Sequence, residues 1–216
     1  MIEFDPQQFQ QAAEDLCRYG KQLYDRDWSP ATSSNYSVRL NDQCCALTSS
    51  GKHKGELTPA DILVVDWQGQ PHSAGKPSAE TLLHTQLYER DASIGAVLHT
   101  HSQSAVVLSQ VLADEVLVLQ GWELLKAFAG QTTHECRMEI PLFANDQDID
   151  RLSKLVEQRM QQHQQGHAYL IRGHGVYTWG RDLAECFRHL EALEHLFSYQ
   201  LELLRLGLAT AATRSL

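Results

Sequence analysis

The chain has 216 residues, of which 43% are hydrophobic, so it is long enough to bury a substantial core within one domain spanning residues 1–216. Its 27 acidic residues outnumber 18 basic ones, and the net charge of -9 argues against a nucleic-acid-binding or membrane-surface protein. The N-terminus lacks a signal-peptide pattern and no apolar run approaches about 18 residues, so we expect a cytoplasmic location. The five cysteines show no C-x-x-C spacing and are expected to be reduced thiols.

Helical and strand elements alternate along the chain. In the first half of the chain, hydrophobic periodicity predicts helices over 6–27 and 77–90 and strands over 36–40, 44–48, 62–66 and 96–101. In the second half of the chain, the pattern predicts a helix from 102 to 112, strands over 115–119, 139–143 and 167–171, and helices over 146–162 and 182–206. The residues Asn41-Asp42 are typical of a turn, so the strands over 36–40 and 44–48 are expected to form a hairpin. Ser78 is expected to cap the helix over 77–90.

The segment 48–55, which follows the second strand, combines hydroxyls, glycines and three potential cations. Such a loop can offer backbone N–H groups, hydroxyls and positive charge to a phosphate without matching a P-loop. An ordinary polar turn is the alternative, and the residues alone leave both interpretations open.

Two histidines, His99 and His101, end an apolar strand at 96–101. Because side chains two apart share one face of a strand, both imidazoles can reach the same small cation. His174 lies between two glycines, which permit close backbone approach, and is the candidate third ligand. Three histidines without a sulfur ligand suit Zn²⁺ with an open coordination position. The alternative is two core histidines and one turn histidine, each satisfied by backbone groups.

Glu123 lies among the apolar residues Trp122, Leu124 and Leu125. A carboxylate in apolar surroundings has a raised pKa, as a proton-transferring group needs near neutrality. We therefore expect a raised pKa for Glu123 if it is buried, and a solvated glutamate on a helix otherwise.

Several motifs resemble, in order and over nearly the whole chain, those of the class II aldolase/adducin family. They are Asn35, Thr48-Ser49-Ser50-Gly51, Lys76-Pro77-Ser78-Ala79-Glu80, His99-Thr100-His101-Ser102 and the run from Arg172 to Gly180 that includes Gly173-His174-Gly175. The resemblance implies a three-layer α/β/α fold with a central, mainly antiparallel sheet. It also implies one zinc ion per subunit on His99, His101 and His174, and a homotetramer with active sites near subunit contacts.

Within the family, segments 50–55, 121–123 and 174–180 are most similar to members that dehydrate a methylthio-substituted ketose phosphate in methionine salvage. The resemblance then implies a zinc-dependent lyase acting on a small sugar phosphate, with no nucleic-acid or membrane partner. The catalytic glutamate of those members falls on Glu123. Glu80 occupies the position at which the sugar-phosphate aldolases of the family carry their own catalytic glutamate, so we also count it as a candidate catalytic residue.

The substrate phosphate is expected among five residues: Asn35, Ser50, Gly51, Lys52 and Ser78. A class II sugar-phosphate aldolase or 4-epimerase is the nearest alternative, because it would use the same three histidines together with Glu80. An adducin-like interaction protein is a further alternative, and it would have no need of metal ligands.

Overall fold

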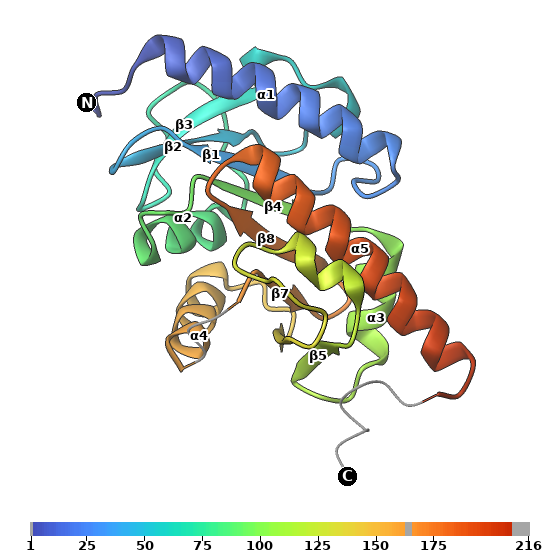
Figure 1. Cartoon of the computed structure of the whole chain (residues 1–216). Helices are drawn as coiled ribbons and strands as arrows, with labels where there is room; N and C mark the ends of the chain where they lie inside the picture. Colours follow the sequence, from blue (N-terminus) through green and yellow to red (C-terminus); the bar gives the residue numbers. More distant parts are fainter. Residues whose placement is uncertain (1, 163–165, 209–216) are drawn as a thin grey trace.

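A computed structural model describes residues 2–162 and 166–208 of the chain (Figure 1). Its strands form one eight-stranded sheet in the order β3-β2-β1-β4-β8-β7-β6-β5. The strands are β1 (Asn35–Arg39), β2 (Cys44–Thr48), β3 (Ile62–Asp66), β4 (Ala96–Thr100), β5 (Val116–Gln120), β6 (Arg137–Phe143), β7 (Ala168–Ile171) and β8 (Gly175–Gly180). Neighbouring strands are antiparallel except β6 and β7, so the prediction of a mainly antiparallel sheet is confirmed.

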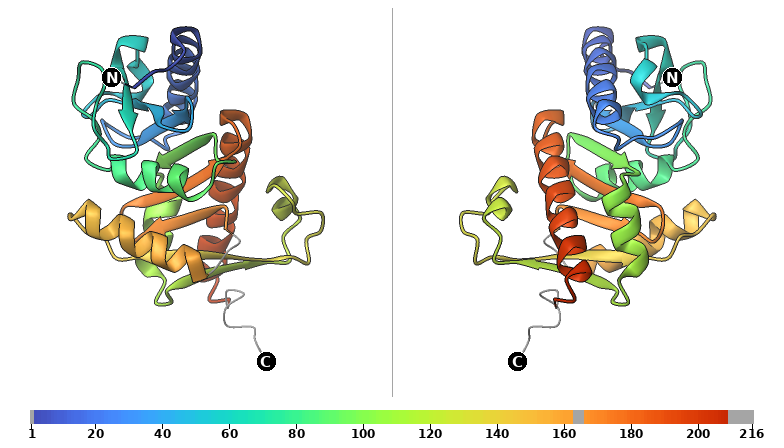
Figure 2. Two further views of the ribbon diagram at one scale, coloured as in Figure 1. Left: turned by 90° about the vertical axis from the view of Figure 1, so that its left-hand side faces the viewer. Right: turned by 90° about the vertical axis from the view of Figure 1, so that its right-hand side faces the viewer.

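Helices cover both faces of this sheet (Figures 1 and 2). They are α1 (Pro6–Asp25), α2 (Thr81–Arg90), α3 (Gln103–Val111), α4 (Ile149–Gln162) and α5 (Leu183–Arg205), with short 3-10 helices η1 (Lys54–Glu56), η2 (Pro59–Asp61) and η3 (Glu123–Ala127). One apolar cluster joins α1, α3 and α5 to one face of the sheet, and a second joins α2 and α4 to the other. The three-layer α/β/α arrangement expected from the sequence is therefore confirmed.

The alternation of side chains along the strands sorts the central residues between these two layers. In β4, Leu98 contributes to the cluster under α1, α3 and α5, whereas Val97 contributes to the cluster under α2 and α4. His99 follows at the position that shares a face with Val97. The end of β4 therefore directs the His99 imidazole toward the α2 side of the sheet.

The predicted start of α2 needs a correction. The helix begins at Thr81 with Glu80 as its N-cap, rather than at Pro77. The preceding residues are held in extended contact with the loop after β2, because Pro77 bridges to Ser49 and the Ser50 amide donates to the Lys76 carbonyl. This contact leaves Ser78 and Glu80 on a loop that faces the end of β4.

Two further expectations concern the chain as a whole. Every cysteine is a free thiol, in agreement with the sequence. Among the residues that the structure describes, no helix is long and apolar enough to cross a membrane.

Candidate active site

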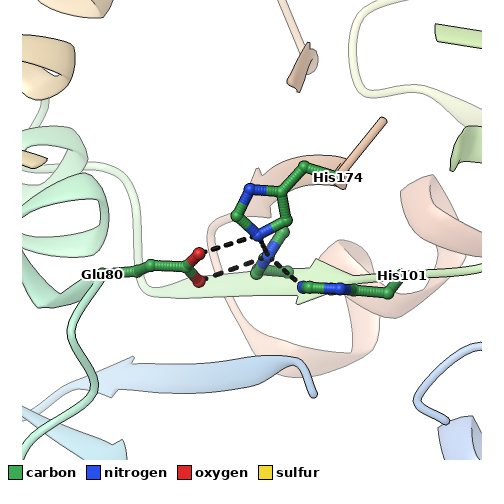
Figure 3. Close-up of side chains that lie close together, drawn as sticks. Glu80, His101 and His174 are labelled. Carbon is green, nitrogen blue, oxygen red and sulfur yellow. Dashed lines mark hydrogen bonds and ion pairs between the residues drawn. The ribbon is translucent and has the colours of Figure 1, made fainter. Parts of the chain in front are cut away.

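Four side chains converge at the end of the central strand β4: Glu80, His99, His101 and His174 (Figure 3). His99 lies in β4 and His101 just beyond its end, while His174 lies in the turn between β7 and β8. Glu80 precedes α2. One potential ligand atom from each residue lies within 4.8 Å of all the others. The convergence of the three histidines predicted from sequence is therefore present in the structure, and Glu80 joins them.

The glycines beside His174 have the conformational role that the sequence suggested. Gly173 has φ +62°, in the left-handed region that favours glycine. A side chain at Gly175 would place its Cβ only 2.0 Å from the Thr100 carbonyl oxygen. The turn can therefore lie against the end of β4 only with glycine at Gly175, and this close approach brings the His174 imidazole to His99.

The three imidazoles face one another through their Nε2 atoms. The Nε2 of His99 lies 2.8 Å from that of His101 and 3.3 Å from that of His174. The Nδ1 of His99 donates to the Val176 carbonyl at 2.9 Å, which places the proton on Nδ1 and leaves the Nε2 lone pair facing the other rings. A hydrogen bond of this kind fixes the tautomer that a metal ligand requires.

Burial keeps the imidazoles of His99 and His101 neutral. It lowers the pKa of His99 to about 3 and that of His101 to about 2. Neutral imidazole is the form that binds a metal ion. Three nitrogens and one carboxylate, with no sulfur, form a donor set that fits Zn²⁺ and other divalent ions, so the residues present fit the expected metal, whose identity the donor set leaves open.

Glu80 is held by hydrogen bonds from three sides. Its Oε1 lies 2.7 Å from the Nε2 of His174, while its Oε2 accepts from the Asn35 amide at 2.7 Å and from the Tyr177 hydroxyl at 3.1 Å. Burial by itself raises the pKa of this carboxyl, but the hydrogen bonds from His174 and Asn35 bring it well below its usual range. Glu80 is therefore an ionised carboxylate beside the imidazoles.

Two of the residues predicted to bind phosphate, Asn35 and Ser78, contact this cluster. Asn35 pairs with His99 across β1 and β4, and its amide also contacts the Ser78 hydroxyl at 3.2 Å. The 48–52 loop contacts the segment before Ser78 and Glu80 through the Ser49–Pro77 bridge. The Ser49 hydroxyl is buried and has no hydrogen-bond partner among the described residues. Asn35 and Ser78 are thus each one hydrogen bond from Glu80.

The two lysines of this loop have different surroundings. Lys52 is half exposed and pairs with Asp61 at 2.8 Å. Lys54 is 1% exposed, and its ammonium donates to the carbonyls of Thr32 and Lys52. Burial lowers the pKa of Lys54 to about 8. Sequence reasoning missed this buried cation because a Lys-His-Lys run gives no signal of which lysine points inward.

Of the two environments considered for Glu123, the structure shows the solvated one for the single chain. Its side chain is 74% exposed on η3, where the carboxylate accepts from Lys126 at 2.6 Å and lies 3.7 Å from His134. The hydrogen bond from Lys126 lowers the pKa of Glu123, whereas the raised value considered from the sequence would have required burial. The extension between β5 and β6 carries η3 outward past α5, away from the sheet (Figure 2). The apolar neighbours Leu124 and Leu125 pack inward and leave the glutamate outside.

Two partners of the site had no clear signal in the sequence. Tyr177 reaches Glu80 only because β8 places it directly opposite His99. Asn145 lies just after β6, and its Oδ1 is 3.4 Å from the Nδ1 of His174. Strand pairing, which local sequence does not specify, brings both residues to the site.

Comparisons with known proteins agree with this geometry. Residues 14–201 match the family model "Class II Aldolase and Adducin N-terminal domain". The chain is 54% identical over 198 residues to a methylthioribulose-1-phosphate dehydratase of Alcanivorax borkumensis, covering 92% of this chain and 94% of that protein. It is 53% identical over 199 residues to the protein of the same name from Pseudomonas aeruginosa, covering 92% and 97%.

Solved structures show the same fold. The L-fuculose-1-phosphate aldolase of Thermus thermophilus superposes with a TM-score of 0.72 at 25% identity, covering 92% of this chain and 97% of that one. The family model, the relatives and the superposition all extend over most of the sequence. The chain therefore belongs to the class II aldolase and adducin family.

Proposed function

We propose that this chain is a zinc-dependent dehydratase that converts 5-methylthioribulose 1-phosphate to 2,3-diketo-5-methylthiopentyl 1-phosphate and water, a step of methionine salvage. The observation that carries the proposal is an ionised carboxylate facing three imidazole nitrogens beside Asn35 and Ser78. The relatives named for this activity, which are 54% and 53% identical to the chain, support the choice of substrate.

His99, His101 and His174 would hold the zinc ion. When bound, the ion acts as a Lewis acid toward oxygens of the substrate and so acidifies the neighbouring C3 proton. Glu80 is the ionised carboxylate closest to the three imidazoles and is the proposed base for that proton. Loss of the C3 proton and of the C4 hydroxyl gives an enol at C3, which tautomerises to the diketone, so hydrogen and hydroxyl leave together as water.

Glu123 is the proposed acid that protonates the departing C4 hydroxyl. In a single chain it is exposed and paired with Lys126, a setting that favours its ionised form. We therefore propose that Glu123 acts in the active site of a neighbouring copy within a homotetramer. Cover by that copy would exclude water and raise its pKa toward neutrality.

The substrate phosphate is proposed to bind among Asn35, Ser50, Gly51, Lys52 and Ser78. Lys52 must then exchange its partner Asp61 for the phosphate. A contact that is equally strong in the ground and transition states affects KM alone. Replacement of Lys52 by Met should therefore raise KM about tenfold and leave kcat within about twofold. A fall in kcat at unchanged KM would instead assign Lys52 to the chemistry.

The deciding experiment is incubation of metal-analysed protein with 5-methylthioribulose 1-phosphate and a panel of other ketose phosphates. The proposal predicts a diketone and no carbon–carbon cleavage. Two smaller carbonyl fragments, or an epimer of the substrate, would contradict it.

An aldolase or 4-epimerase remains the second candidate, favoured by the contact of Glu80 with His174 and by the superposition on an aldolase. Product analysis separates the two activities. An adducin-like interaction protein would not need four metal-ligating side chains within 4.8 Å of one another, and their presence argues against that alternative.

A further inference from the structure

A continuous line of buried hydrogen bonds leads from the interior to Glu80. The Tyr88 hydroxyl lies 2.8 Å from the Ser37 hydroxyl, which lies 2.7 Å from the Nδ1 of His84. The Nε2 of His84 is hydrogen bonded to the Asn35 Oδ1, and the Asn35 amide nitrogen lies 2.7 Å from the Glu80 Oε2. We refer to these five residues as the Tyr88–Glu80 chain.

The orientation of the Asn35 amide fixes the direction of the bonds nearest to Glu80. Asn35 turns its NH₂ group toward the Glu80 Oε2, to which it donates, and its Oδ1 toward His84. The Nε2 of His84 must therefore carry a proton and donate to Asn35. No other assignment avoids two acceptors facing each other.

The remaining directions follow from the neutral state of His84. Burial lowers its pKa to about 3, so its Nδ1 keeps a lone pair and must accept from Ser37. The Ser37 hydroxyl has then used its proton and accepts from Tyr88. All the donors along the Tyr88–Glu80 chain point toward Glu80.

This line is shielded from solvent. Ser37 and His84 are 0% exposed, Tyr88 is 2% exposed and Asn35 is 5% exposed. Water is therefore kept from replacing a lost partner, so a group left unpaired here is destabilising. The second hydrogen of the Asn35 amide goes to Ser78, a proposed phosphate ligand. One amide thus links the proposed base and the proposed phosphate site.

We propose that His84 is a positioning residue, which fixes the orientation of the Asn35 amide and, through it, both the Glu80 carboxylate and the Ser78 hydroxyl. The inference rests on the proposed function for its kinetic consequence. The tautomer that it requires does not depend on any activity. Without the Nε2–H donor, the Asn35 amide is free to rotate and present Oδ1 to the carboxylate, which would displace Glu80 from the imidazoles.

The kinetic test compares His84→Leu, His84→Gln and Tyr88→Phe as metal-loaded, full-length proteins. Loss of an orienting partner costs about 10- to 100-fold in activity, so His84→Leu should lower kcat by that factor at full metal content. His84→Gln keeps an N–H donor toward Asn35, and its kcat should be at least about tenfold higher than that of His84→Leu. Tyr88→Phe removes only the hydroxyl at the far end of the Tyr88–Glu80 chain, and its kcat should stay within about threefold of the parent value.

A kcat of His84→Leu within about twofold of the parent, or a His84→Gln variant as inactive as His84→Leu, would overturn the inference. The second measurement is nitrogen-15 NMR of the histidine-labelled parent chain, with the His84 signals identified by their loss in His84→Gln. It should show the Nε2–H tautomer, and the Nδ1–H tautomer would refute the assignment even if His84→Leu fails to fold. A parent chain that shows this tautomer but does not dehydrate the substrate would refute the proposed function and leave the assignment standing.

Discussion

Three imidazole nitrogens and a carboxylate that face one another within 4.8 Å form an arrangement that a cation stabilises. The Nδ1 of His99 is committed to the Val176 carbonyl, so its Nε2 keeps a lone pair pointed at its neighbours. Lone pairs and carboxylate charge repel one another in a buried site unless a proton or a metal ion lies between them. At the residue scale, this repulsion is the physical argument for a bound divalent ion.

Replacement of His174 by Ala should reduce bound zinc from about one ion per chain to less than about a tenth under dialysis, because two imidazoles seldom hold a catalytic metal. Metal content measured by atomic emission checks this, with His195→Ala as the control, since His195 is exposed on α5. Full zinc occupancy in His174→Ala would exclude the three-histidine site.

At the element scale, the extension between β5 and β6 is fastened to α5 at the end of η3. Arg188 donates to the Ala127 carbonyl at 2.9 Å, and the Ala129 amide donates to the Nε2 of His189 at 3.1 Å. The other nitrogen of His189 donates to the Trp179 carbonyl at 2.8 Å. His189 therefore joins η3, α5 and β8 and determines where Glu123 projects.

Replacement of His189 by Leu removes both of these hydrogen bonds and leaves the Ala129 amide and the Trp179 carbonyl without their partner. The expected result is a loss of stability of about 1–3 kcal/mol and a lower kcat at unchanged metal content. Chemical denaturation, metal analysis and kinetics check it. The matched control is His195→Leu, because His195 lies on the same helix but is exposed. This substitution should change stability and kcat little. Loss of metal in His189→Leu would show that the substitution disturbs the three-histidine cluster instead.

At the scale of the whole molecule, the separation of Glu123 from Glu80 predicts that complete sites need two copies of the chain. Glu80→Gln and Glu123→Gln should each be nearly inactive alone. Co-assembled in equal amounts, they should recover about one quarter of the parent activity, because each half of a shared site is intact with a probability of about one half. Size-exclusion chromatography of the mixed assembly and its kcat provide the measurement. If the mixture stays inactive although the two variants co-assemble, both glutamates act within one chain.

Acid sensitivity is also a property of the whole fold. Burial lowers the pKa of His84 to about 3 and that of His167 to about 4, from an unfolded value near 6.5. Because the unfolded chain binds these protons more readily, the stability that the neutral rings contribute is complete above about pH 6.5 and is lost as the pH falls toward those values.

We therefore expect the melting temperature to fall by more than about 5 °C between pH 7 and pH 4.5. Calorimetry at a series of pH values checks this prediction. His167→Gln should show a shallower pH dependence than the parent chain. An equal dependence in that variant would mean that His167 does not contribute.

The sequence by itself determined the elements and the ligand types. Periodicity located β2 and β3 at their observed bounds, because a buried strand and an amphipathic helix impose local patterns on side chains. The spacing of His99 and His101 identified half of the cluster for the same reason, and the glycines beside His174 indicated a constrained imidazole. The resemblance to a family supplied the three-layer arrangement and the mainly antiparallel sheet, which no local pattern contains.

Only the tertiary structure decided which groups meet. Tyr177 and Asn35 reach the site because β8 and β1 lie on either side of β4, and strand order depends on long-range packing. Packing likewise buried Lys54 and left Lys52 exposed, and it left the Glu123 side chain on the surface of the single chain. Electrostatic surroundings, and hence pKa values, come from contacts between residues far apart in sequence. For that reason the apolar neighbours of Glu123 in the sequence did not decide between a buried and a solvated carboxylate, whereas the histidine spacing, fixed by the strand itself, gave the right cluster.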